Sequence, residues 1–166
     1  MSKPTTHDLI RRGTRLLQRG KHIQALEPLE KAHRQAPDDF DAGLNLSAAY
    51  IMNKKFKQAI PILESLRDQD SENPMIWTNL GAAYLGNPVL AKDSDQLRAI
   101  AAFRTALEYD PQTPNAAYNI GLIYKDRKEW AIAAQWFEIA LGAKSADQDA
   151  QYWHDEMQQR LLDSSG

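Results

Sequence analysis

A period of 34 residues is the feature of this sequence that most constrains the fold. Small residues recur at spacings of 34, 34 and 40: Gly13, Ser47, Gly81 and Gly121. Alanines recur at spacings of 34, 40 and 34: Ala25, Ala59, Ala99 and Ala133. Two independent columns therefore agree on one period, with six extra residues inside the third unit. Self-similarity of this kind is typical of repeat architectures, in which each unit buries its apolar face by stacking on its neighbours.

Three further columns keep the same phase: Leu16, Tyr50, Tyr84 and Tyr124, then Leu29, Leu63, Phe103 and Phe137, then Ala32, Leu66, Ala106 and Ala140. Residues 77–84 read W-x-x-L-G-x-x-Y. The combined pattern resembles the tetratricopeptide repeat family, whose unit is a pair of antiparallel helices, and it covers about residues 6–145. The chain departs from the family pattern in the tryptophan column, which only Trp77 fills, and in the closing proline, which stands only at Pro37 and Pro111.

The resemblance implies an all-α fold, a right-handed α-solenoid of four helix-turn-helix pairs plus a C-terminal capping helix, in one domain over residues 1–166. The repeats are expected at about 6–39, 40–73, 74–113 with the six-residue insertion, and 114–145. A capping helix is expected at about 146–163, because Ser145 and Gln148 form a helix-start pattern. One apolar stripe follows it: Ala146, Ala150, Trp153, Met157 and Leu161.

The first unit differs from the others on one helical face. Units two to four carry an apolar stripe at i, i+4 and i+7: Ala42, Leu46 and Ala49, then Ile76, Leu80 and Ala83, then Ala116, Ile120 and Ile123. The same columns of unit one hold Asp8, Arg12 and Arg15. We expect the stripe to pack on the preceding unit, so that unit one is a true end of the solenoid. The basic strip of Arg12, Arg15 and Arg19 is then either a solvated capping face or a docking site.

The six-residue insertion lies within residues 86–95. Gly86-Asn87-Pro88 should end one helix, and Asp93 with Gln96 resembles a capping box that opens the next. The insertion is either a tolerated longer loop or a lip beside a binding groove, with Val89 and Leu90 touching a ligand. Pro28 and Pro61 stand a few residues after a turn, which predicts late helix starts or mild kinks.

Composition excludes several functional classes. The 166 residues contain no cysteine, which removes disulfides, thiolate metal sites and thiol nucleophiles. The net charge of −2 argues against nucleic-acid binding, although residues 1–36 carry eight basic and three acidic side chains while the remainder carries twelve and nineteen. We find neither a signal peptide nor an apolar run of about 20 residues, so no membrane insertion is expected and a cytoplasmic location is predicted.

The sequence offers no catalytic site and no metal site. The histidines are dispersed over different units, and none of the nucleotide, hydrolase or zinc-protease motifs is present. Acidic residues on solenoid helices are most often solvated. We therefore expect no enzyme activity, no cofactor and no bound metal.

The family resemblance indicates where a ligand would bind. In the family the first helix of each pair lines a concave surface, and the residue two before the small-residue column points into it. That position holds Arg11, Asn45, Asn79 and Asn119. Asparagine amides both donate and accept, so a row of them can hydrogen-bond the backbone of an extended peptide, as in asparagine ladders of the family. The alternative is that these amides support contacts between helices.

The other positions expected in the groove are largely apolar: Leu44, Ile51, Met52, Met75, Thr78, Ala82, Leu85, Tyr118 and Leu122. They predict a ligand with hydrophobic side chains, although some of them are expected to pack between units instead. A carboxylate clamp of the kind found in chaperone-tail adaptors is disfavoured, because the matching positions of unit one hold Ile10 and Thr14.

The sequence thus predicts a non-catalytic interaction module or adaptor whose partner is another protein or a peptide segment. The alternative is a self-associating scaffold, a homo-oligomer in which the basic first unit of one copy meets the acidic C-terminal end of the next.

Overall fold

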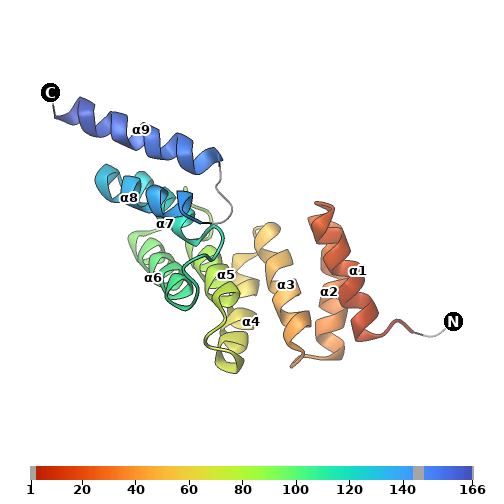
Figure 1. Cartoon of the computed structure of the whole chain (residues 1–166). Helices are drawn as coiled ribbons and strands as arrows, with labels where there is room; N and C mark the ends of the chain where they lie inside the picture. Colours follow the sequence, from red (N-terminus) through yellow and green to blue (C-terminus); the bar gives the residue numbers. More distant parts are fainter. Residues whose placement is uncertain (1–2, 144–147, 166) are drawn as a thin grey trace.

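The computed structural model describes residues 3–143 and 148–165, and within these ranges it contains nine α-helices and no strand. The helices are α1 Thr6–Gln18, α2 His22–Gln35, α3 Phe40–Met52, α4 Phe56–Gln69, α5 Pro74–Leu85, α6 Asp93–Tyr109, α7 Ala116–Asp126, α8 Trp130–Leu141 and α9 Gln148–Ser164. Successive helix pairs stack along the chain from α1 to α9 (Figure 1). The chain therefore adopts an all-α helical repeat fold, as the 34-residue period of the sequence predicts.

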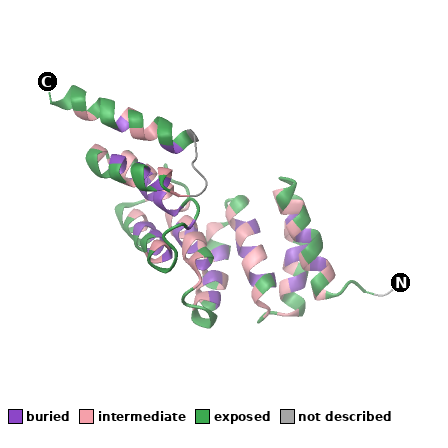
Figure 2. Cartoon of the chain, in the orientation of Figure 1, coloured by how far each residue is buried: buried purple, intermediate pink, exposed green. Residues whose placement is uncertain are grey.

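The apolar stripes of the repeat are the core. In α3, α5 and α7 the i, i+4, i+7 residues are buried, and the alanine, leucine and phenylalanine columns of α2, α4, α6 and α8 are buried opposite them. Figure 2 shows these buried residues on the faces where neighbouring helices meet. In α1, by contrast, the same columns leave Arg12 and Arg15 exposed and Asp8 half-buried. Burial thus follows the sequence columns, unit by unit.

Close helix approach depends on the small-residue column. A Cβ atom placed on Gly81 would lie 2.6 Å from Cε1 of Phe103, and one on Gly121 would lie 2.7 Å from Cε1 of Phe137. The glycines therefore make room for the rings of the following helix. Ser47 occupies this column in α3, fully buried, and its hydroxyl donates to the Leu44 carbonyl at 2.8 Å.

Neighbouring units are also joined by polar contacts. The Tyr50 hydroxyl donates to Glu30 and the Tyr84 hydroxyl donates to Glu64, each at 3.0 Å. Burial, reinforced by the glutamate, raises the pKa of Tyr50 to about 12, and the same causes raise the pKa of Tyr84. The corresponding position before Tyr124 holds Arg104, which cannot accept such a bond.

The third and fourth units are bridged in a different way. Arg127, in the turn after α7, contacts Asp93 and donates to Gln96 at 3.0 Å, so it reaches the first turn of α6. It also donates to Glu129 at 2.7 Å. One arginine thus ties the α7–α8 turn to the preceding unit.

Several local predictions need correction. Helix α6 does begin at Asp93, but its capping contact joins the Lys92 amide to Asp95 at 3.0 Å, one residue earlier than the predicted pair of Asp93 and Gln96. Gln96 instead accepts from Arg127. Pro28 and Pro61 delay no helix start, because α2 and α4 begin well before them and run through both prolines.

The C-terminal helix α9 packs beside α8. Ala150 and Met157 are fully buried, and the half-buried Trp153 packs against the cluster that contains Met157 and Phe137. The predicted stripe is therefore buried at Ala150 and Met157 and half-buried at Trp153 and Leu161, whereas Ala146 and the helix-start residue Ser145 lie outside the described residues. Each helix in the described part of the chain falls short of the length and hydropathy that a membrane crossing requires.

Candidate peptide-binding surface

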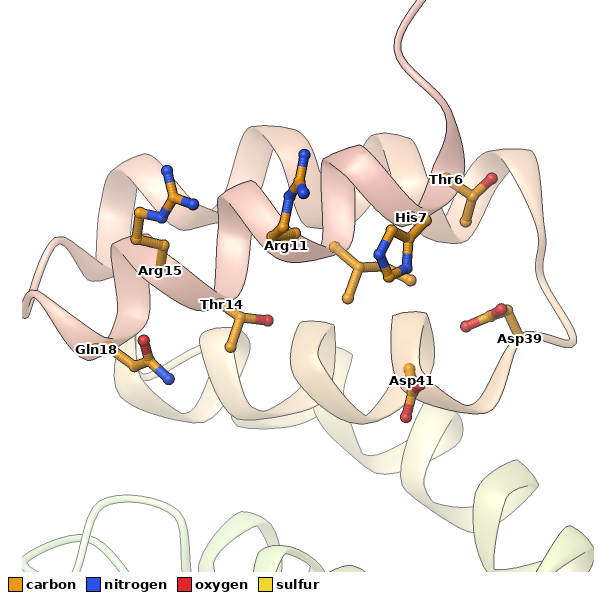
Figure 3. A pocket seen from close by; sticks show the side chains of 9 residues that line it. Thr6, His7, Arg11, Thr14, Arg15, Gln18, Asp39 and Asp41 are labelled. Carbon is orange, nitrogen blue, oxygen red and sulfur yellow. The ribbon is translucent and has the colours of Figure 1, made fainter.

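A cavity of about 570 Å³ lies between α1 and α3, and we call it the first-unit cavity. It is lined by Thr6, His7, Ile10, Arg11, Thr14, Arg15, Gln18, Asp39 and Asp41. The α1 residues recur every three or four positions, which places them on one helical face. The side chains of α1 line one wall, and the two aspartates at the start of α3 line the other (Figure 3). The cavity is therefore charged on both sides.

Local hydrogen bonds hold the charged groups of this cavity in place. Asp39 caps α3 by accepting the Ala42 amide at 2.8 Å. Arg11 pairs with Asp8 at 3.2 Å. Hydrogen bonds from Thr5 lower the pKa of the Asp8 carboxyl, so that group stays ionised beside Arg11. Among the residues predicted for the groove, Arg11 lines this cavity, and its charged surroundings differ from the apolar lining that we expect further along.

Asn45 uses its amide inside the protein. Its Oδ1 accepts the Thr14 hydroxyl at 2.9 Å, and its Nδ2 donates to the Asp41 carbonyl at 2.8 Å. The first bond joins α1 to α3, so this asparagine supports a contact between helices, which is the alternative that the sequence left open. Its amide is engaged on both sides in the free protein.

Asn79 and Asn119 hold the same repeat position on α5 and α7, and both are half-buried. Neither amide has a hydrogen-bond partner among the described residues. The preceding units explain the missing donor to the amide oxygen, because the positions equivalent to Thr14 there are Ala48 and Ala82, which carry no hydroxyl. Two of the three asparagines therefore keep their donors and acceptors available.

Most of the apolar residues predicted for the groove also serve the core. Leu44 and Ile51 pack against the cluster of units one to three, Ala82 and Leu85 against the next cluster, and Tyr118 and Leu122 against the cluster around Phe137. The Thr78 hydroxyl donates to the Pro74 carbonyl at 2.8 Å.

Met52 and Met75, by contrast, are exposed. Met52 is the last residue of α3 and lines a cavity with the α1–α2 turn, and Met75 is the second residue of α5. The two methionines therefore stand at the helix ends, away from the middle positions of the asparagines. Val89 and Leu90 are exposed on the inserted loop, and Leu90 lines a separate cavity with residues of α4 and α6.

Sequence reasoning considered four residues of the first-unit cavity as possible binding positions, Ile10, Arg11, Thr14 and Arg15, but it missed the other five: Thr6, His7, Gln18, Asp39 and Asp41. Their helical spacing on α1 was visible in the sequence. The cavity itself depends on the distance between α1 and α3, and the repeat pattern of the sequence does not predict that distance.

The comparisons with known proteins agree with this architecture. Two models described as tetratricopeptide repeat match residues 16–85 and 90–150. The general transcriptional corepressor ssn6 of Schizosaccharomyces pombe is 33% identical over 103 residues, which is 61% of this chain and 9% of that protein. The corepressor trfA of Dictyostelium discoideum is 26% identical over 124 residues, 74% of this chain and 8% of that protein. The chain thus spans less than a tenth of either relative.

Solved structures resemble the fold. A thermophilic tetratricopeptide repeat protein of Thermus thermophilus superposes with a TM-score of 0.80 at 18% identity, covering 95% of this chain and 83% of that one. A MamA structure from Desulfovibrio magneticus RS-1 gives a TM-score of 0.71 at 22% identity, covering 86% and 77%. At these identities the likeness concerns the fold alone.

Proposed function

Because this chain belongs to the tetratricopeptide repeat family, whose repeats serve as protein-interaction modules, we propose that it is a non-catalytic adaptor that binds a peptide segment of a partner protein. The peptide lies across the first helices of the repeats, from the first-unit cavity toward α7. The observation that carries this proposal is the pair of available amides, Asn79 and Asn119, at one repeated position on α5 and α7.

The chemistry of these positions suits an extended backbone. A peptide presents an N–H and a C=O at each residue, and an asparagine side chain can pair with both. Equivalent positions on successive repeats meet successive stretches of the same peptide. Asn45 is expected to contribute less, because Thr14 and Asp41 already satisfy its amide. Apolar contacts from half-buried residues such as Leu44 and Leu122 add affinity for hydrophobic side chains of the ligand.

The double replacement of Asn79 and Asn119 with alanine is expected to weaken binding by about 5- to 150-fold, since two hydrogen bonds of about 0.5–1.5 kcal/mol each are removed. The partner is first recovered from cell lysate on the immobilised chain and reduced to a peptide with overlapping synthetic fragments. Affinity for that labelled peptide is then measured by fluorescence anisotropy. Unchanged affinity in the double variant would rule out a role for the asparagines.

Two matched variants sharpen this experiment. Asn45→Ala removes the same side chain at a position whose amide is already engaged, and its affinity is expected to change less than that of Asn79→Ala. Ala48→Thr places a hydroxyl where Thr14 stands one unit earlier, and it is expected to occupy the Asn79 amide and weaken binding while Asn79 remains. Thermal unfolding of each variant separates lost binding from lost stability.

Self-association is a second candidate function, favoured by the charges at the two ends of the fold. Helix α1 exposes Arg12 and Arg15, while α9 carries four acidic residues against one arginine, and the two helices lie at opposite ends of the stack (Figure 1). If copies associate through these ends, the mass measured by light scattering should rise at about 0.01 M salt, where the Debye length is about 30 Å, and fall at about 1 M, where it is about 3 Å. A constant monomer mass at both ionic strengths contradicts this candidate.

A further inference from the structure

The connection between α5 and α6 departs from the other turns within helix pairs. The α1–α2, α3–α4 and α7–α8 connections each consist of three residues: 19–21, 53–55 and 127–129. At each of these turns one residue adopts a positive φ: Gly20, Lys54 and Lys128. Residues 86–92 replace that short turn in the third unit. The insertion therefore lengthens this connection from three residues to seven, and α6, with 17 residues, is also longer than α2, α4 and α8.

The loop is ordered by its own hydrogen bonds, and it leaves both of its large aliphatic side chains exposed. It turns at Gly86, whose φ of 62° favours glycine. The Asn87 side chain then accepts the Val89 amide, and the Asn87 carbonyl accepts the Leu90 amide, each at 3.0 Å. Val89 is 89% exposed and Leu90 is 74% exposed. The two adjacent side chains form a small exposed apolar patch on an ordered turn.

A cavity of about 320 Å³, the insertion cavity, lies beneath this loop. Its apolar wall includes Phe56 and Ile60 of α4, Leu85 at the end of α5, and Leu90. This volume stands at the lower end of the range of about 300–1,000 Å³ for ligand pockets, which is room for one or two side chains. None of the three asparagines lines it. The insertion cavity is therefore a separate place from the asparagine positions.

Two cations flank the apolar wall. Lys57 is exposed and has no ion-pair partner within the described residues, and the Arg98 side chain is 59% exposed. The Arg98 guanidinium stacks over the Tyr84 ring, 3.9 Å from its centroid, and lies 4.0 Å from Glu64. Stacking fixes the position of the positive charge beside the cavity. Asp95 also lines the cavity and accepts the Lys92 amide while keeping its negative charge, so the lining carries two positive charges and one negative.

We propose that the insertion cavity is a second docking site, which binds a segment of a partner protein carrying an aliphatic side chain beside carboxylates. The aliphatic group enters the space between Leu90, Phe56 and Ile60, and the carboxylates pair with Lys57 and Arg98. Charge complementarity selects this occupant over a basic segment. The site goes beyond the proposed peptide surface, since it lies at the ends of α4, α5 and α6 and uses neither Asn79 nor Asn119.

The probe for this site is a blocked synthetic peptide with one leucine flanked by two glutamates in a glycine–serine background. Its control replaces both glutamates with lysine. Titration into the ¹⁵N-labelled full chain is followed by NMR. The acidic peptide is expected to shift the amides of Ile60, Leu90 and Arg98 and to bind more weakly as salt is raised, while the lysine peptide shifts none of them. No shift with the acidic peptide, or equal shifts with both peptides, overturns the proposal.

Variants assign the binding to this cavity. Leu90→Ser and Lys57→Glu are each expected to lower the affinity of the chain for the acidic peptide by at least about fivefold. Ile23→Ser and Lys31→Glu change an exposed aliphatic and an exposed basic side chain on α2, and both are expected to leave the affinity for the acidic peptide unchanged. Asn79→Ala is also expected to leave this affinity unchanged. Loss of binding in Asn79→Ala would place the peptide on the asparagine positions instead. Shifts at Leu90 that grow with protein concentration in the absence of peptide would identify a second copy as the occupant and overturn the proposal.

Discussion

Replacing Phe103 with alanine is expected to lower the free energy of unfolding by about 3–5 kcal/mol. Phe103 is fully buried, and its ring lies against Gly81 on the facing helix, where no side chain can move in to fill the vacated space. The loss combines the transfer free energy of the ring with the cost of the cavity that remains. Urea unfolding followed by far-ultraviolet circular dichroism measures the change.

Tyr109→Ala is the matched control for this variant. Tyr109 is an aromatic residue of the same helix, α6, but its side chain is exposed. Surface substitutions generally change stability by about 0.5 kcal/mol or less. Similar losses in the two variants would mean that the Phe103 ring does not stabilise the contact between α5 and α6.

Gly81→Ala is expected to destabilise the fold by about 1–3 kcal/mol, although alanine favours helix by about 0.5–1 kcal/mol over glycine. The added methyl group would lie 2.6 Å from the Phe103 ring, which is fully buried and cannot swing away. The same urea titration gives the free energy. A stabilised Gly81→Ala variant would show that α5 and α6 can separate at no cost.

The second unit suggests how to relieve this clash. There Ser47 stands in the glycine column and Leu63, rather than phenylalanine, stands opposite. In the double variant Gly81→Ala with Phe103→Leu, the smaller side chain leaves room for the methyl group. The double variant is therefore expected to lose less free energy of unfolding than the sum of the losses in the two single variants, by at least about 0.5 kcal/mol. Additive losses would contradict direct contact between the two positions.

The helix pairs and their buried columns could be read from the sequence because both depend on periodic burial. The alanine column, for example, recurs in phase as Ala25, Ala59, Ala99 and Ala133, and it is buried in every unit. Contacts that occur once are different. The capping contact of α6 joins Lys92 to Asp95, and nothing in the neighbouring residues distinguished it from a pair one position later.

The candidate site illustrates the same limit. The sequence located Asn45, Asn79 and Asn119 at one repeated position, but it treated them as equivalent. They differ because the side chain facing each amide comes from the preceding unit, where Thr14 is replaced by alanine in later repeats. Whether an asparagine amide is hydrogen-bonded depends on which residues of two helices lie side by side, so the sequence columns alone could not predict it.

The polar contacts that join neighbouring units differ in kind from one joint of the stack to the next. The first two joints each carry a half-buried tyrosine–glutamate hydrogen bond, which salt screens little, whereas Arg127 bridges the third joint to acidic and amide groups nearer the solvent. Ionic strength is therefore expected to weaken the contact of Arg127 with Asp93, and the exposed Arg98–Glu64 pair of the second joint, more than the tyrosine–glutamate hydrogen bonds. A rise in salt is therefore expected to loosen the second and third joints of the stack before the first, which carries the Tyr50–Glu30 hydrogen bond.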